Sequence, residues 1–299
     1  MKDIDYAYEV HRLLSKKRTT ISCIIPAYNE GERIGNVLEI VLAFPCFDEI
    51  IAVNDGSKDN TLKVLENYKK KFPNIKVIDI QPNAGKANAV VEAVNHSSSE
   101  LICLVDADLS GLSFEYLYKM IYFVLNNEYD MTILDRAGDR AAIIGWSQSW
   151  VARFNGGERA LWKKDFKKID IDRKSRYAIE QCINMYYVKN EKKVRTIYCP
   201  NLYGAYQYNK KGLVDGLKTY RNMFIEVYKA SSVKGFYIQV ENIVEDRLEP
   251  LYEILEKSKN KVQRNTTLGV ILAAGLITSI ATFAWLNVRN SAKKIVNQE

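Results

Sequence analysis

The sequence predicts an α/β protein with a mostly parallel sheet that helices cover on both faces, followed by a C-terminal transmembrane helix. Two observations predict this fold. Between residues 20 and 110, short β-branched runs alternate with segments of helical periodicity, and the connections are short. Further along, residues 265–288 contain no charged side chain over 24 positions, which is long enough to cross a bilayer as a helix.

The strands and helices of the first half can be assigned in order. Expected strands lie within residues 20–30, 48–60, 75–80 and 100–110, and expected helices within residues 31–44, 61–72 and 84–97. The first helix shows the pattern best, because its apolar residues Ile34, Val37, Leu38 and Val41 recur at helical spacing. Alternation of this kind is typical of a parallel sheet with helices on both faces.

Polar residues close three of these strands. They are residues 28–30, 54–57 and 106–108. Because ligands of such sheets bind outside the carboxyl ends of the strands, we expect these three groups to line one site.

Asp106 and Asp108 form the most informative of these groups. Hard carboxylate oxygens suit Mg²⁺ or Mn²⁺, which usually shares its coordination shell with substrate phosphates. The alternative is a pair of solvated turn carboxylates. The apolar run 101–105 directly before the pair favours a cation site at a strand end.

The second half of the chain is less regular. A fifth strand that ends in charged residues is expected within residues 130–140, and a further helix within residues 176–191. The segment 195–212 is expected to form a strand and a turn. Between residues 162 and 174 lie six basic residues, which indicate either a surface for anionic lipid headgroups or a solvated helix.

Composition excludes several classes of site. The net charge of +7 is compatible with anionic partners such as nucleotides or a membrane surface, and we expect no nucleic-acid partner. The five cysteines show no metal-knuckle spacing and no disulfide framework, which favours a reducing compartment. The two histidines lie outside the motifs, which argues against a histidine metal site or a Ser-His nucleophile.

Four motifs, in this order and spacing, resemble the family 2 glycosyltransferases of the GT-A fold. They are IIPAYNE (24–30), VNDGSKDNT (53–61), NAGKANAV (83–90) and LVDADLSGLS (104–113). The resemblance covers about residues 20–210. It implies a nucleotide-sugar donor and a divalent cation, Mg²⁺ or Mn²⁺.

The resemblance also implies roles for individual residues. The expected donor-binding residues are Pro26, Tyr28, Glu30, Asp55, Lys86 and Asp106. Asp106 and Asp108 would form the metal site, with Asp108 the more direct ligand. Three of these residues could instead have a purely structural role. Asp55 could only stabilise a turn, Glu30 could help begin the first helix, and Lys86 could be a surface lysine.

The acceptor side of the site is expected to come from the second half. Arg136, Arg159 and Glu180 are the acceptor-side candidates, and Asp135 and Asp139 are possible catalytic bases. Arg159 could instead pair with Glu158 or Asp165, and Glu180 could be solvated or paired. Relatives often place a metal-binding histidine where this chain has residues 206–208, so the third metal ligand stays open.

The chain is expected to divide into five segments. They are a helical extension (1–19), the GT-A domain (20–210), a helical connection (211–264), the transmembrane helix (265–288) and a short tail (289–299). Small residues four apart in 265–288 permit a homodimer through this helix, although the segment could also be a buried core helix. Since no signal peptide is evident, we expect a single-pass membrane protein with a cytoplasmic catalytic domain.

These observations together predict a membrane-anchored glycosyltransferase. It would move a sugar from a UDP- or GDP-sugar to a lipid-linked or membrane-proximal acceptor, of which polyprenyl phosphate is one candidate. A retaining enzyme acting on a small phosphorylated acid such as 3-phosphoglycerate is the first alternative. A sugar nucleotidyltransferase is a second, although residues 26–35 poorly match its glycine-rich loop, and a non-catalytic nucleotide-binding membrane protein is a third.

Overall fold

The computed structural model describes residues 5–136, 156–171, 173 and 179–204. Asp139, the connection 211–264, the transmembrane segment 265–288 and the tail 289–299 lie outside these residues. Within the described ranges, no helix combines the length and the apolar character needed to span a bilayer.

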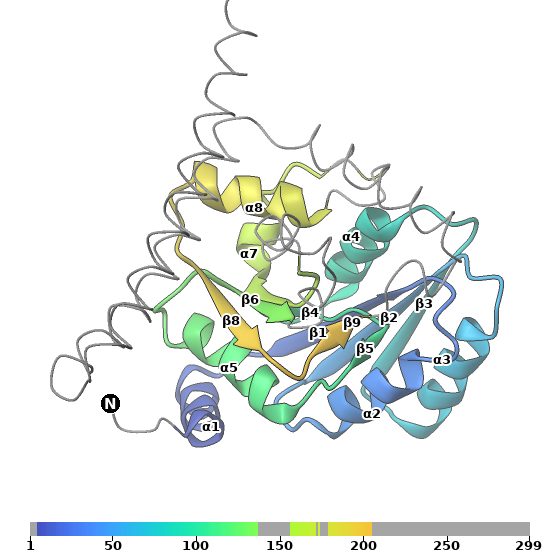
Figure 1. The fold of residues 1–299 in the computed structure, drawn as a ribbon, viewed down its shortest axis with the longest axis horizontal. Helices are drawn as coiled ribbons and strands as arrows, with labels where there is room; N and C mark the ends of the chain where they lie inside the picture. Colours follow the sequence, from blue (N-terminus) through green and yellow to red (C-terminus); the bar gives the residue numbers. More distant parts are fainter. Residues whose placement is uncertain (1–4, 137–155, 172, 174–178, 205–299) are drawn as a thin grey trace, which may run out of the picture. The chain divides into compact units, whose positions relative to one another are not determined.

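A seven-stranded, mostly parallel sheet forms the centre of the described structure (Figure 1), as predicted. Its strands, in spatial order, are β3 (Ile75–Ile80), β2 (Glu49–Asp55), β1 (Ile21–Ala27), β4 (Leu101–Leu104), β7 (Arg159–Trp162), β6 (Met131–Arg136) and β8 (Val194–Cys199). Among these strands only β7 runs antiparallel to its neighbours, β4 and β6. The late strand β7 therefore lies between β4 and β6, beside the end of β4.

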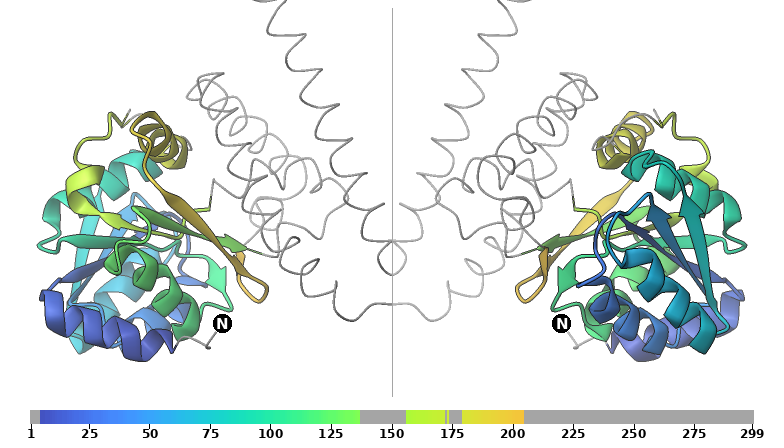
Figure 2. Two further views of the ribbon diagram at one scale, coloured as in Figure 1. Left: turned by 90° about the vertical axis from the view of Figure 1, so that its left-hand side faces the viewer. Right: turned by 90° about the vertical axis from the view of Figure 1, so that its right-hand side faces the viewer.

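Helices cover both faces of the sheet. The helices of one face are α1 (Tyr6–Lys17), α2 (Ile34–Ala43), α3 (Thr61–Lys71) and α5 (Phe114–Leu125), and those of the other are α4 (Lys86–His96), α7 (Lys163–Phe166) and α8 (Ile179–Lys189). Figure 2 shows the two helical layers from the side. Two apolar cores result, one on each face, so the central strands β1 and β2 are buried on both sides.

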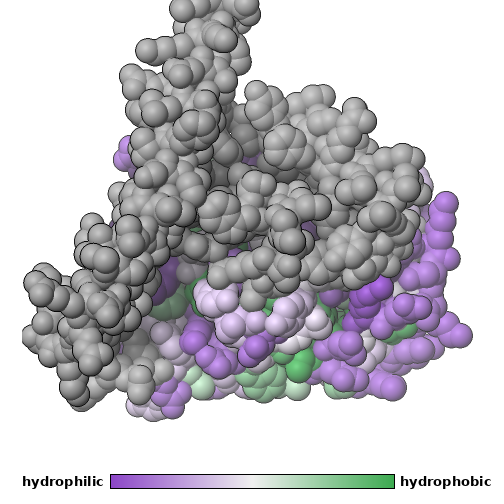
Figure 3. Space-filling view, in the orientation of Figure 1, coloured by the Kyte–Doolittle hydropathy of each residue, from purple (hydrophilic) through white to green (hydrophobic). Residues whose placement is uncertain are grey.

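The N-terminal helix predicted within residues 1–19 is present and belongs to this layered structure. Val10 and Leu13 of α1 are buried in the same core as α5. On the same face, α3 buries only Thr61 and Leu65, and hydrophilic side chains dominate the described surface around it (Figure 3).

A second, two-stranded sheet lies beside the end of β4. It pairs β5 (Leu109–Ser110) with β9 (Tyr203–Gly204) in antiparallel register, Leu109 opposite Gly204. The chain thus returns after β8 to the segment that directly follows Asp108.

Candidate functional site

The predicted convergence of polar residues at the carboxyl ends of the strands is confirmed for the first two groups by direct contacts. Asn29 has a left-handed backbone (φ 58°), and its N–H donates to Ser57 Oγ at 3.0 Å. In return, the Lys58 N–H donates to Asn29 Oδ1 at 2.8 Å. The loop after β1 and the loop after β2 are therefore held together beside the exposed ring of Tyr28.

The main chain of Glu30 connects the end of β1 to the starts of α2 and α3. Its carbonyl accepts hydrogen bonds from the N–H groups of Arg33 and Ile34, both at 2.9 Å, at the start of α2. Its own N–H donates to Thr61 Oγ1 at 2.9 Å. Pro26 lies in β1 opposite Val53. Contacts of Pro26, Tyr28 and Glu30 with a nucleoside stay predictions.

Asp55 anchors the loop that leads into α4. Its buried carboxylate accepts hydrogen bonds from the Ala84 N–H at 2.8 Å, the Gly85 N–H at 2.9 Å and Asn83 Nδ2 at 2.9 Å. Gly56 (φ 67°) is needed for this approach, because a Cβ there would lie 2.3 Å from the Asn83 nitrogen. Asp55 thus fixes the position from which Lys86 begins α4.

Lys86 bridges two carboxylates and is not a simple surface lysine. Its Nζ donates to Glu180 Oε1 at 2.6 Å and lies 2.7 Å from Asp106 Oδ1. Burial alone would lower the pKa of Lys86, but Asp106 and Glu180 outweigh burial and raise this pKa above its ordinary value. Lys86 therefore carries its full charge at neutral pH.

Arg136 extends this arrangement on the other side of Asp106. Its Nη1 lies 3.8 Å from Asp106 Oδ2 and 3.5 Å from Glu158 Oε1. We call the five residues the charge network; in order of contact they are Glu158, Arg136, Asp106, Lys86 and Glu180. The network joins residues from α4, α8, the end of β6, the end of β4 and the turn before β7.

Glu158 is a member of this network that the sequence suggested only as a partner of Arg159. It is fully buried, and neither carboxylate oxygen has a hydrogen-bond partner among the described residues. Burial raises the pKa of Glu158 to about 7, although Arg136 acts in the opposite direction. The signal for Glu158 in the sequence was its position directly before the strand Arg159–Trp162, which forms β7.

Arg159 is a buried residue that links β7 to α8. It is completely buried, its Nε donates to Gly156 O at 2.8 Å, and its Nη1 donates to Asn184 Oδ1 on α8 at 2.6 Å. Burial lowers the pKa of Arg159 to about 10. These bonds tie β7 to α8, the helix that carries Glu180, so they support a positioning role, while contact with an acceptor stays a prediction.

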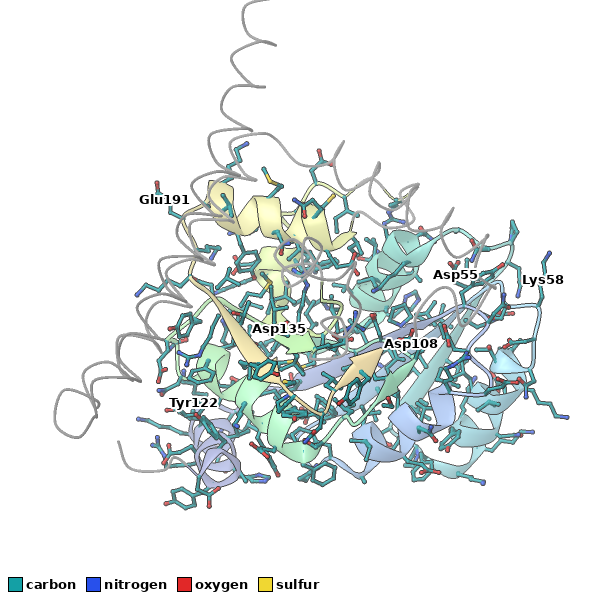
Figure 4. All side chains as sticks on the ribbon, in the orientation of Figure 1. Asp55, Lys58, Asp108, Tyr122, Asp135 and Glu191 are labelled. Atoms are coloured by element: carbon teal, nitrogen blue, oxygen red, sulfur yellow. The ribbon has the colours of Figure 1, made fainter. Side chains whose placement is uncertain are left out.

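The remaining acidic candidates lie at strand ends. Asp135 is buried at the end of β6, opposite Tyr198 of β8, and Asp108 is partly exposed between β4 and β5. Figure 4 shows Asp55, Asp108 and Asp135 among the elements around the sheet, whereas Lys58 and Glu191 lie at the periphery. Catalytic roles for Asp135 and Asp139 stay predictions.

The residues at the end of β4 fit a divalent cation of the Mg²⁺ or Mn²⁺ type. Asp106 and Asp108 offer two hard carboxylates one residue apart, and Gly157 lies close against Asp106. A Cβ at Gly157 would fall 2.4 Å from both Asp106 oxygens, so only a glycine allows the carboxylate to occupy this position. In the part of the chain that the structure describes, no three His, Cys, Asp or Glu side chains group to hold a metal. A cation that completes its shell with water and substrate phosphates suits two carboxylates.

The chain is similar in sequence to known glycosyltransferases. The family model described as "Glycosyl transferase family 2" matches residues 22–187. Over 94 residues the chain is 45% identical to a dolichyl-phosphate β-glucosyltransferase of Trichomonas vaginalis, and the match covers 28% of each chain. The chain thus spans little more than a quarter of this curated relative.

Solved structures show the same fold at low sequence identity. Glucosyl-3-phosphoglycerate synthase of Mycobacterium tuberculosis, in complex with Mn²⁺, UDP-glucose and phosphoglyceric acid, aligns with a TM-score of 0.58 at 16% identity, covering 73% of this chain and 83% of that one. Mannosyl-3-phosphoglycerate synthase of Rubrobacter xylanophilus aligns with a TM-score of 0.62 at 16% identity, covering 76% and 78%. The expected GT-A-like α/β fold is therefore confirmed.

Proposed function

The chain belongs to glycosyl transferase family 2, and from this premise we propose that it transfers a sugar from a UDP- or GDP-sugar to a lipid-phosphate acceptor at a membrane. The charge network carries the proposal. It places three carboxylates and two permanent cations at the end of β4, where a parallel sheet binds its ligand. Such a site suits a substrate that is itself an anion and arrives with a cation.

On the donor side, the loops after β1 and β2 would hold the nucleoside, with Tyr28 exposed beside them. Asp106 and Asp108 would hold the cation. A bound Mg²⁺ or Mn²⁺ supplies charge neutralisation of the leaving diphosphate. Lys86 begins α4 and can exchange a carboxylate partner for a diphosphate oxygen, since helix N-termini favour anions.

On the acceptor side, Arg136 is the residue best suited to a phosphate. Its guanidinium offers a planar fork that matches a phosphate group, and its side chain is 17% exposed. A phosphate oxygen is already a nucleophile at neutral pH, so transfer to it needs little help from a general base. Asp135 would then be dispensable for the proton balance of this reaction.

The lipid nature of the acceptor is supported from two directions. The charge-free segment 265–288 would keep the site near a bilayer and raise the effective concentration of a lipid acceptor. The curated relative is named for dolichyl phosphate, a lipid phosphate. We extend the proposal to a single-pass anchor with the catalytic domain on the cytoplasmic side, and to pairing of two chains through that helix.

A second acceptor class is favoured by the fold comparison. The aligned synthase structure contains UDP-glucose and phosphoglyceric acid, a small soluble phosphorylated acid. Both acceptor classes share a phosphate that Arg136 can bind, so the network alone does not distinguish them.

The experiment incubates the full chain in liposomes with Mn²⁺ and a panel of UDP- and GDP-sugars labelled in the sugar. Polyprenyl phosphate and 3-phosphoglycerate are offered in separate reactions. The proposal predicts labelled product that extracts into organic solvent, with nucleotide release that depends on polyprenyl phosphate. Labelled product that forms only with 3-phosphoglycerate would replace the lipid acceptor by the small acid.

A further inference from the structure

Arg136 is shared between two carboxylates at the edge of the site. Its Nη1 lies 3.5 Å from Glu158 and 3.8 Å from Asp106. Gly204 closes a further side, because a Cβ on this glycine would lie 2.4 Å from the same nitrogen. The guanidinium thus has an acid on two sides and the chain of β9 on a third.

The two oxygens of Asp106 face different protein cations. Lys86 is at ion-pair distance from Oδ1, at 2.7 Å, whereas Arg136 stands 3.8 Å from Oδ2, which is too long for a hydrogen bond. If Arg136 closed this gap, its guanidinium would compete with a cation for Oδ2. A cation would then have to displace Arg136 as well as Lys86 to bind both oxygens of Asp106.

Glu158 is the group that opposes this closure. It is fully buried, and within the described ranges its oxygens have the Arg136 ion pair but no hydrogen bond. A buried carboxylate of this kind depends on an opposite charge for compensation. The attraction between Glu158 and Arg136 therefore pulls the guanidinium away from Asp106.

We propose that Glu158 is a positioning residue that holds Arg136 back from Asp106 and so keeps Asp106 able to bind the divalent cation. This inference rests on the proposed function, because it needs a cation at Asp106. Glu158 would affect the cation affinity of the site only through the position of Arg136.

The test measures Mn²⁺ binding to the full chain in detergent by electron paramagnetic resonance of the unbound ion, with UDP and, in a parallel series, with GDP. Glu158→Gln keeps the side-chain shape and removes the charge, and we expect roughly tenfold weaker Mn²⁺ affinity. The matched control is Glu92→Gln, whose carboxylate pairs with Arg173 at 2.7 Å on the surface. This control is expected to bind Mn²⁺ like the wild type.

A double-mutant cycle separates positioning from a general charge effect. In the Arg136→Gln background, Glu158→Gln is expected to cause no further loss of Mn²⁺ affinity. An equal loss in both backgrounds, or wild-type affinity in Glu158→Gln, would overturn the inference.

Two further outcomes are decisive. If circular dichroism shows that Glu158→Gln does not fold, the test uses Arg136→Gln alone. This variant lacks the competing side-chain cation, so its Mn²⁺ affinity must equal or exceed that of the wild type. A lower affinity overturns the inference. If the wild type binds no Mn²⁺ with either nucleotide, the proposed function fails together with the inference. Normal wild-type binding with unaffected Glu158 variants would overturn the inference alone.

Discussion

Replacing Asp55 by alanine tests whether one carboxylate supports both the fold and the donor pocket. The change removes three hydrogen bonds, to the Ala84 N–H, the Gly85 N–H and Asn83 Nδ2. Ala84 is exposed, so water can replace its partner, whereas Gly85 is buried and its N–H would be left unsatisfied. A buried unsatisfied donor costs about 1–3 kcal/mol and each lost bond to a charged acceptor about 1.5 kcal/mol.

The expected loss in the free energy of unfolding is therefore about 3 kcal/mol. For a chain of this size, such a loss lowers Tm by roughly 6–10 °C. Because the same bonds fix the loop before Lys86, we also expect UDP or GDP binding in the presence of Mn²⁺ to weaken at least tenfold. Thermal unfolding followed by tryptophan fluorescence and calorimetric titration of the nucleotide measure the two effects.

Asp48→Ala is the matched control for this prediction. Asp48 lies at the opposite, amino-terminal end of the strands, and its carboxylate accepts one hydrogen bond from the Ile21 N–H at 2.7 Å. We expect a smaller loss of about 1 kcal/mol and unchanged nucleotide affinity. The reasoning is refuted if Asp55→Ala melts like the wild type, or if it is destabilised but binds nucleotide normally.

Three further predictions follow from other contacts. Burial alone would raise the pKa of Glu49, but hydrogen bonds from Lys76, Ser22 and Ser98 lower it to about 2 from an ordinary 4.5. The stability that Glu49 contributes is therefore complete above pH 4.5 and is lost as the pH falls toward 2. Glu49→Gln should flatten this part of an acid-unfolding curve. Gly157→Ala pushes on the Asp106 carboxylate and should weaken Mn²⁺ binding severalfold, measured by paramagnetic resonance; unchanged affinity contradicts the packing argument. Glutamine at three exposed lysines of the basic stretch should reduce transfer to polyprenyl phosphate in anionic liposomes but not in detergent; the three are Lys164, Lys167 and Lys168.

Local patterns predicted the layered fold well. The alternation of apolar runs and helical periodicity is a short-range property, and it correctly located β1 to β4 and the helices between them. The position of β7 between β4 and β6 could not be predicted, because strand order depends on pairing between residues far apart in the sequence, such as Cys103 with Ala160.

The candidate site was predictable only in part for the same reason. Asp106 follows a strand end and was identified from that position, whereas Lys86 was identified through the family resemblance. Lys86 contacts Glu180, which lies 94 positions further along the chain, and Asp106 faces Arg136 from another strand; no local pattern encodes either pair. Arg159 was proposed for the acceptor side from its guanidinium chemistry, and that chemistry could not predict its burial or its hydrogen bond to Asn184.

The central claim is that the end of β4 binds a nucleotide diphosphate together with a divalent cation. Calorimetric titration of UDP and of GDP into the full chain, with Mn²⁺ and with EDTA, tests it most directly when Asp108→Ala is measured beside the wild type. We predict that at least one nucleotide binds the wild type only with Mn²⁺, and that Asp108→Ala keeps the wild-type circular dichroism spectrum but loses this binding. Nucleotide binding that persists in EDTA, or equal Mn²⁺-dependent binding by the folded Asp108→Ala variant, would contradict the claim.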